Sequence, residues 1–324
     1  MVDYLLYQNV PIENALIDAV NTNDLEIVNI VLQHNKKASF INKRTKEGSA
    51  LSIAIKNNNL LIVQRLLSLQ GINPNLYNEK GEPPLIQAVS LLNVEIFDAF
   101  IDFHNKKQIK VTHFNEGLKT ALDLISKNDL DIEKVKSIIK SLLKVRDIDP
   151  NCYNENNTLL TYFCETNNIS LVEILLKNDK TDVNLSVPRT GNTPLLVAIE
   201  RKNTEIIKLL IDDNRTDINM KNYKRQSPLI MSVNKNLKEI VNLLLNNESF
   251  DPYESDISYA LYVSRSEITK ELINNKDIDV NYVHFDRDTN VHHKINSYKS
   301  VLMKSVINND KEKVEIIIQH RSFD

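Results

Sequence analysis

The chain has 324 residues, of which 42% are hydrophobic and 26% charged, a composition typical of globular domains rather than of disordered tails. Its 40 basic residues against 43 acidic ones give a net charge of −3, so no overall positive field attracts nucleic acid, and we expect no nucleic-acid partner. Five glycines and two cysteines leave no material for a glycine-rich phosphate loop, a disulfide framework or a four-cysteine zinc site.

The first residues, MVDYLLYQN, carry an aspartate at position 3 and lack the apolar core of a secretory signal. The longest apolar runs, such as residues 195–199, are far shorter than the ~18 residues of a membrane-spanning helix. We therefore expect no membrane insertion and a cytoplasmic location, with the nucleus equally compatible with the sequence.

A pattern repeats along nearly the whole chain. Residues 193–222 and 227–253 match with a displacement of 34 residues, and related segments occupy 49–75 and 83–101. A residue near the middle of the first helix of each unit marks nine units, at a mean spacing of about 36 residues. These anchors are Ala19, Ala54, Ala88, Ile125, Phe163, Ala198, Ser232, Ala260 and Ser305. A period of this length is typical of stacked helical units.

The unit around residues 193–222 shows the physical logic. Thr193 and Pro194 are suited to start a helix, because the hydroxyl caps free N–H groups and proline fixes φ in the first turn. Leu195, Ala198 and Ile199 then form one apolar stripe. A second helix follows, with a wide apolar face made by Ile206, Ile207, Leu209, Leu210 and Ile211. Because neither helix can bury its stripe alone, neighbouring units are expected to stack.

The pattern T-P-L-x-x-A, then I-(I/V)-x-L-L, then D-(V/I)-N resembles the ankyrin repeat family. The resemblance implies an all-α, ankyrin-like solenoid of stacked helix-turn-helix units with β-hairpin-like fingers, forming a single domain over residues 1–324. The expected units are 10–42, 45–75, 79–112, 115–151, 154–184, 189–219, 223–253, 254–281 and 296–324. The family's histidine after the leucine is absent, the finger between the seventh and eighth units is almost deleted, and the finger at 282–299 is extended.

Candidate chemistry is sparse. His284, His292 and His293 in the long finger form the one histidine cluster, but adjacent residues on a strand point to opposite faces, so we predict no metal site. An opening D-x-D-x-N at 286–290 lacks the glycine and the glutamate of a calcium loop. Cys164 is expected to pack as a small apolar residue. No catalytic motif is present, so the sequence predicts no catalytic residue, no cofactor and no enzyme activity.

Turn residues follow a further rule. Glycine is expected where the first helix ends, yet asparagine often stands there, and asparagine tolerates the left-handed backbone region. The positions are Asn58, Asn59, Asn93, Asn167, Asn168, Asn203, Asn236, Asn308 and Asn309. All five glycines are expected in turns or fingers, and His34, His104, His113 and His320 in loops or at the ends of second helices.

The remaining candidate is a surface. In ankyrin-like stacks the fingers and the exposed positions of the first helices line a concave side where ligands dock, which implies a protein-binding scaffold or adaptor. The corresponding residues are Thr45, Lys46, Lys56, Glu79, Lys80, Glu82, Ser90, Leu91, Glu165, Arg189, Glu200, Arg201, Tyr223, Lys224, Gln226 and Lys235. Tyr223 with Arg189 and Arg201 is the preferred hot spot, because aromatic and arginine residues dominate interface energies. The alternative to a binding role is that each of these residues is simply a solvated surface side chain.

A second hypothesis is structural. No polar capping repeat follows the last unit, so its stacking face is expected to be open. The chain would then be a spacer or assembly segment of a longer array, with possible self-association through this C-terminal face. The identity of a protein partner is not given by the sequence.

Overall fold

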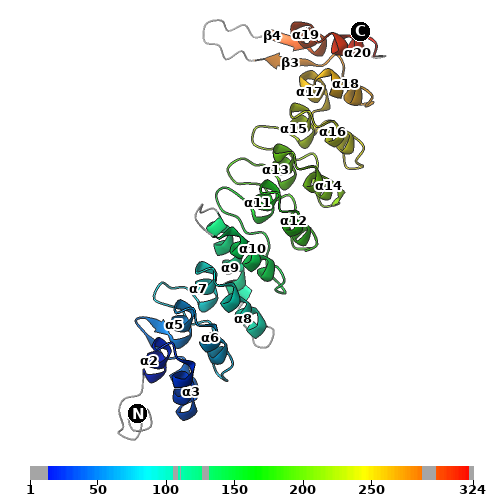
Figure 1. The fold of residues 1–324 in the computed structure, drawn as a ribbon. Helices are drawn as coiled ribbons and strands as arrows, with labels where there is room; N and C mark the ends of the chain where they lie inside the picture. Colours follow the sequence, from blue (N-terminus) through cyan, green and yellow to red (C-terminus); the bar gives the residue numbers. More distant parts are fainter. Residues whose placement is uncertain (1–13, 105–108, 110, 126–130, 287–296, 321–324) are drawn as a thin grey trace, which may run out of the picture. The chain divides into compact units, whose positions relative to one another are not determined.

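The computed structural model describes residues 14–104, 109, 111–125, 131–286 and 297–320. By their internal contacts the residues fall into two compact units, Met1–Asn154 and Glu155–Asp324, where the sequence predicts one domain. Each unit is a stack of helix pairs, and the all-α fold expected from the repeat pattern is confirmed over the described residues (Figure 1).

Unit 1 contains four helix pairs among its described residues. The pairs are α2 (Ala15–Asn21) with α3 (Leu25–His34), α5 (Ala50–Lys56) with α6 (Leu60–Leu67), α7 (Pro84–Ser90) with α8 (Val94–His104), and α9 (Val111–Ile125) with α10 (Ile132–Leu142). Between the first two pairs lie the short helix α4 (Ala38–Ile41) and a hairpin of β1 (Arg44–Thr45) and β2 (Gly48–Ser49).

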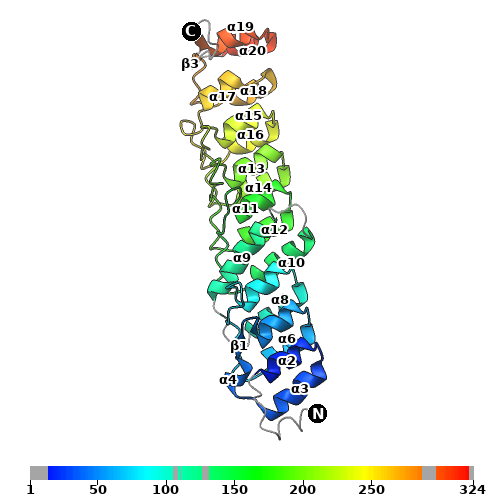
Figure 2. The ribbon, with the colours of Figure 1, turned by 90° about the vertical axis from the view of Figure 1, so that its left-hand side faces the viewer.

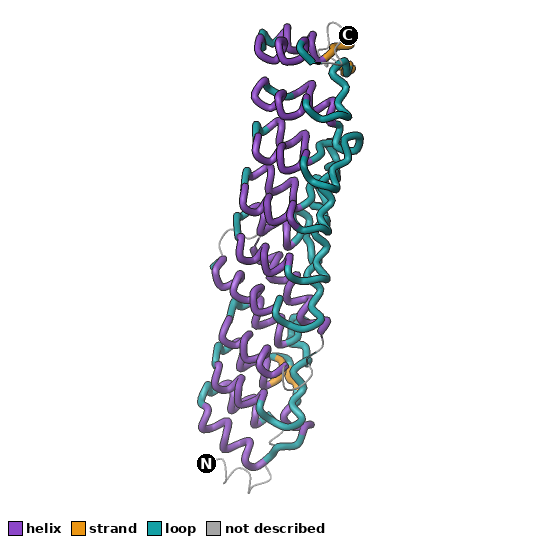
Figure 3. The backbone as a smooth tube through the Cα atoms, turned by 90° about the vertical axis from the view of Figure 1, so that its right-hand side faces the viewer, coloured by secondary structure: helices purple, strands orange, loops and turns teal. Residues whose placement is uncertain are grey.

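Unit 2 contains five pairs among its described residues. They are α11 (Leu159–Glu165) with α12 (Ile169–Leu176), α13 (Pro194–Arg201) with α14 (Thr204–Asp212), α15 (Pro228–Asn234) with α16 (Lys238–Leu245), α17 (Ile257–Val263) with α18 (Ser266–Ile273), and α19 (Val301–Ile307) with α20 (Lys311–Ile318). First helices pack against first helices and second helices against second helices, and the loops of this unit gather along one side (Figures 2 and 3).

The first helices form the interior of each stack. In α13 the six residues from Pro194 to Ile199 are all buried, because the neighbouring pairs cover the helix on both sides. The second helices bury one face only, as in α14, where Ile206, Ile207, Leu210 and Ile211 are buried. Leu209, expected on the buried face, is half-buried.

A hydroxyl caps most first helices, as the sequence predicts. The Thr193 side chain accepts a hydrogen bond from the N–H of Leu196 at 3.3 Å, and Ser227 serves α15 in the same way at 3.2 Å. The side chains of Ser49, Thr158 and Ser300 cap α5, α11 and α19. Each cap satisfies an N–H that the helix leaves unpaired.

The prediction that asparagines take the left-handed conformation at the helix turns is only partly correct. Asn58, Asn167, Asn236 and Asn309 have positive φ, but Asn93 and Asn203 do not, and Leu92 and Lys202 take the left-handed conformation instead. Both exceptions have one cause: at each of these turns the residue with positive φ is the one directly before the N-cap of the second helix. Asn93 and Asn203 occupy that cap, where their side chains accept from the N–H groups of Ile96 and Ile206.

Helix α9 corrects three expectations. It runs from Val111 to Ile125, so Ile125, the expected mid-helix anchor, is its last residue. Gly117 lies within the helix rather than in a turn, and a Cβ there would meet Ile86, Val89 and Leu142 at 3.7 Å. His113 is not in a loop but buried in α9, with its ring edge-on to Tyr77 at 6.2 Å between centroids.

The fingers are tight turns more often than strands. In unit 2 the N–H of Val187 donates to Asn192 O at 2.9 Å and that of Asn222 to Gln226 O at 3.1 Å, without strand pairing. A true hairpin forms in the long finger, where β3 (Val283–Asp286) pairs antiparallel with β4 (Ser297–Ser300). His292, His293 and most of the D-x-D-x-N segment lie outside the described residues.

Candidate functional site

The predicted surface residues of unit 1 lie mostly on turns and at helix ends. Lys56, at the end of α5, forms an exposed ion pair with Glu79 at 3.8 Å. Glu82 accepts a hydrogen bond from the Asn78 side chain at 3.1 Å. The other members of this set are Thr45, Lys46, Lys80, Ser90 and Leu91, and the Leu91 side chain is 52% exposed.

In unit 2 the three residues of the preferred hot spot each have a different partner. Arg201 forms an ion pair with Glu165, which links α13 to α11. Arg189 donates to the Asn156 side chain at 3.3 Å. Tyr223 is 70% exposed, and its ring lies against the backbone of Gly191, where an added Cβ would come within 2.6 Å of it. Arg201 is thus committed to a carboxylate, whereas Tyr223 offers a fixed and accessible ring.

Four predicted residues line one hollow of about 630 Å³ on unit 2. They are Glu200, Lys224, Gln226 and Lys235. The ends of α13 and α15, the turn before α15 and the start of α18 together form its wall. The remaining lining residues are Lys202, Met231, Asn234, Asn236 and Arg265. The hollow, with Tyr223 on the same turn as Lys224, is the candidate functional site.

A chain of amide contacts holds the wall of the hollow. The Oδ1 atom of Asn222, a buried residue, accepts from the N–H groups of Lys224 and Gln226 at 3.0 and 2.9 Å. Its Nδ2 donates to Asn192 Oδ1 at 2.8 Å, and Asn192 in turn donates to Glu200 at 3.1 Å. The turn that carries Lys224 is therefore fixed to the preceding turn and to α13.

Sequence reasoning missed Lys202, Arg265 and Met231. Lys202 has φ of 58° and follows α13, where asparagine stands in several other pairs. The signal that could have revealed Lys202 is that a lysine replaces asparagine at this repeated position. Arg265 precedes α18 and Met231 is a buried residue of α15, and both join the hollow only through the stacking of successive pairs.

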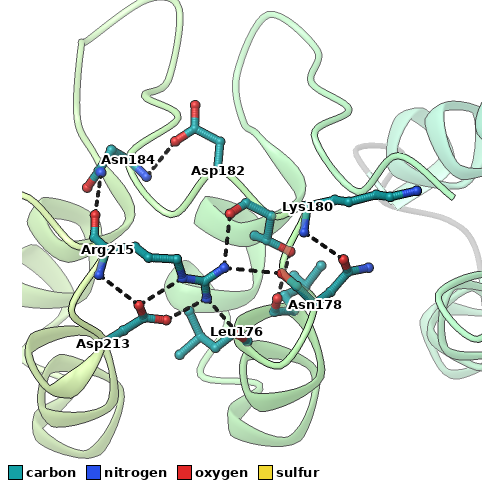
Figure 4. A network of polar contacts seen from close by, with 9 residues as sticks. Leu176, Asn178, Lys180, Asp182, Asn184, Asp213 and Arg215 are labelled. Carbon is teal, nitrogen blue, oxygen red and sulfur yellow. Dashed lines mark hydrogen bonds and ion pairs between the residues drawn. The ribbon is translucent and has the colours of Figure 1, made fainter. Parts of the chain in front are cut away.

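A second network joins successive pairs away from the hollow (Figure 4). The Arg215 guanidinium donates to the carbonyls of Leu176 at 2.6 Å and Asn178 at 3.2 Å, at the end of α12. It also binds both carboxylate oxygens of Asp213, at 2.9 and 2.6 Å, and this contact lowers the pKa of Asp213. Asn184 of the D-x-N motif donates to Arg215 O at 2.8 Å and accepts from the Asp217 N–H at 2.8 Å.

Neither cysteine is suited to act as a nucleophile. Burial raises the pKa of the Cys152 thiol to about 12 and that of Cys164 further still, which favours the unreactive thiol. No group of three potential metal ligands gathers among the described residues. None of the described helices combines the length and hydrophobicity that a membrane span requires.

Another hollow, of about 460 Å³, lies at the short finger between α16 and α17. It is lined by Tyr253, Tyr259 and Tyr282 together with several aspartates. Elsewhere in α17, the Nζ of Lys304 lies over the Tyr262 ring, 4.1 Å from its centroid. Asp256 of this hollow already pairs with Lys221 at 2.7 Å.

Comparison with known proteins finds a family match over part of the chain. Residues 131–222 match the family model of ankyrin repeats, in three copies. Among solved structures, the ankyrin repeat domain of Bcl-3, described as a unique member of the IkappaB protein family, is 18% identical, with a TM-score of 0.36 over 80% of this chain and 97% of that one. EF0377, an ankyrin repeat protein, is 20% identical, with a TM-score of 0.30 over 72% and 98%. No curated protein matches the sequence.

Proposed function

We propose that this chain of ankyrin repeats is a non-catalytic scaffold or adaptor that binds a protein partner through the hollow of unit 2 and the adjacent Tyr223. The observation that carries the proposal is the hollow itself, about 630 Å³ in volume and lined by residues of several successive helix pairs. Its wall is held by buried amide contacts, so little ordering is needed on binding. A location in the cytoplasm stays a prediction, supported by the two free cysteines.

Tyr223 supplies the adjacent anchor. Its side chain is 70% exposed, yet Gly191 leaves just enough room for the ring on the preceding turn. A partner would therefore meet a large apolar surface whose orientation is already set, and such aromatic residues contribute strongly to interface energies.

The test is selection of peptides from a displayed library of the source proteome against the full chain. We expect the selected peptides to lose about tenfold or more in affinity for the Tyr223→Ala, Lys235→Ala variant. The Lys177→Ala variant is the matched control, since Lys177 is exposed at the end of α12 and does not line the hollow. Failure to select any peptide, or equal affinity for both variants, contradicts the proposal.

A second candidate is assembly through the face of α19 and α20. Met303 and Val306 are 56% and 60% exposed, whereas Ile230 and Val233, at the same positions of α15, are 2% and 3% exposed because the next helix pair covers them. We propose a second copy of this chain as the occupant. Sedimentation should show concentration-dependent dimers that the Val306→Lys variant abolishes, and a monomer at every concentration would exclude this candidate.

A further inference from the structure

The charges of unit 2 are balanced within one row of helices. Along the second helices, three lysines each meet a glutamate of the next pair. The pairs are Lys208 with Glu239 at 2.6 Å, Lys238 with Glu271 at 2.8 Å, and Lys270 with Glu312 at 2.6 Å. This row therefore neutralises its own cations and leaves little for a charged partner to bind.

The hollow at the ends of the first helices is not balanced. Lys202, Lys224, Lys235 and Arg265 line it with a single carboxylate, Glu200. Among the described residues, none of the four cationic side chains has an ion-pair partner within 4.0 Å, although the chain as a whole carries a net charge of −3. The lining of the hollow thus carries more cations than carboxylates on a slightly acidic protein, and the nearby Glu267, which accepts from the Asn236 side chain at 2.9 Å, offsets only one of them.

Helix dipoles account for only part of this charge. Lysine at the end of a helix is favourable because the end carries about half a negative elementary charge. Two such ends, those of α13 and α15, border the hollow at Lys202 and Lys235. They offset about one of the surplus positive charges, so a clear positive excess remains for a ligand.

We propose, resting on the function proposed above, that the hollow binds a short segment of a partner protein rich in glutamate and aspartate. Its volume of about 630 Å³ accommodates a few residues rather than a folded surface. The buried side chain of Met231 provides an apolar contact for the stems of the acidic side chains, while the lysines and Arg265 meet their carboxylates.

Nucleic acid fits the hollow less well than an acidic peptide. Proteins that bind single strands combine a cationic track with aromatic side chains on which the bases stack. None of the residues that line the hollow is aromatic, the adjacent Tyr223 offers a single ring rather than a series, and the cations surround one hollow rather than following a groove. Carboxylates on a flexible peptide need only the cations.

The experiment uses fluorescence anisotropy of a labelled peptide of alternating glutamate and glycine, with the glutamine counterpart as the uncharged probe. At low ionic strength the full chain should bind the glutamate peptide at least about tenfold more tightly than the glutamine peptide, and added salt should weaken the difference. A Lys224→Gln, Lys235→Gln variant should lose about tenfold, whereas Lys177→Gln should stay within about twofold of the wild type.

Lys202→Asn separates loss of charge from loss of structure. Asparagine occupies the same left-handed position at Asn167 and Asn236, so this variant should keep or raise thermal stability while it weakens binding of the glutamate peptide. Equal binding of the two peptides, unchanged affinity in the double variant, or tighter binding of an oligothymidylate than of the glutamate peptide would overturn the inference. If the displayed library yields ligands of the hollow that lack acidic residues, the proposed function stands and this inference fails.

Discussion

Arg215 connects two consecutive helix pairs by donating to the backbone carbonyls of Leu176 and Asn178 at the end of α12. Its side chain is 32% exposed, so part of its interaction with Asp213 is screened by water. We predict that Arg215→Met lowers the free energy of unfolding by about 1–2 kcal/mol, mainly because the carbonyl of Leu176 loses its hydrogen bond from the guanidinium, whereas that of Asn178 keeps the N–H of Thr181 at 3.0 Å. Urea denaturation measures it, with Arg146→Met, a 96% exposed side chain, as the control. Equal losses in the two variants would contradict the prediction.

Lys313 is a buried cation of unit 2, with 3% exposure, and it occupies the position that Ile240 has in α16. Its Nζ donates to Leu261 O at 2.7 Å and Ser264 O at 2.6 Å, at the end of α17. Burial lowers its pKa from 10.5 to about 8. Between these two values the unfolded chain binds a proton that the folded chain does not, so stability rises with pH.

We therefore predict that the wild type gains stability relative to Lys313→Met as pH rises from about 8 to 10.5, by up to about 3 kcal/mol. Below pH 8 both states are protonated and the difference between the two proteins should be constant. Denaturant titrations of both proteins across this range provide the measurement, and subtracting the variant removes the titration of other groups. A difference that falls with pH would show that the charged form is favoured in the fold.

At the scale of the helix, the turn between paired helices ends in two residues with fixed roles: a left-handed residue is followed by the N-cap of the second helix. Asn168 and Asn203 cap α12 and α14, but Leu237, with φ of −93° and ψ of 73°, provides no cap for α16. We predict that Leu237→Asn raises the free energy of unfolding by about 0.5–1 kcal/mol, because the backbone already has the capping conformation. Thermal denaturation tests it, and Asn203→Ala should shift stability in the opposite direction. A loss of stability in Leu237→Asn would indicate that its half-buried side chain matters more than the cap.

Helix pairs could be predicted from the sequence because their apolar stripes and hydroxyl caps are local signals. The turns were predicted less well, because the left-handed conformation belongs to a position in the repeat and not to one residue type. Leu92 and Lys202 adopt it at that position although neither is asparagine or glycine. Helix α9 escaped prediction because its 15 residues depart from the seven or eight typical of the other first helices, so Ile125 was placed mid-helix.

At the scale of the stack, four of the nine residues that line the hollow were predictable as surface residues. Glu200, Lys224, Gln226 and Lys235 follow from their places in a repeated unit, because repeats put equivalent positions on the same side. Arg265 does not, since it belongs to the next helix pair, at the N-cap of α18, and joins the hollow only through the stacking of successive pairs. The concentration of charge is likewise a property of several pairs together, whereas the whole sequence is nearly neutral.

Stacks in which each pair contacts mainly its neighbours should lose stability locally. Phe163 is fully buried in α11, which packs on α12 and α13. We predict that Phe163→Ala, at a cost of about 3–5 kcal/mol, reduces amide-exchange protection most in α11, α12 and α13, and progressively less toward α17 and α18. Hydrogen exchange read by mass spectrometry measures this gradient. Tyr253→Ala, at an 80% exposed site, should leave protection unchanged. A uniform loss from α11 to α20 would instead show that unit 2 unfolds as one cooperative body, and the hollow between α13, α15 and α18 would then share the stability of the whole unit.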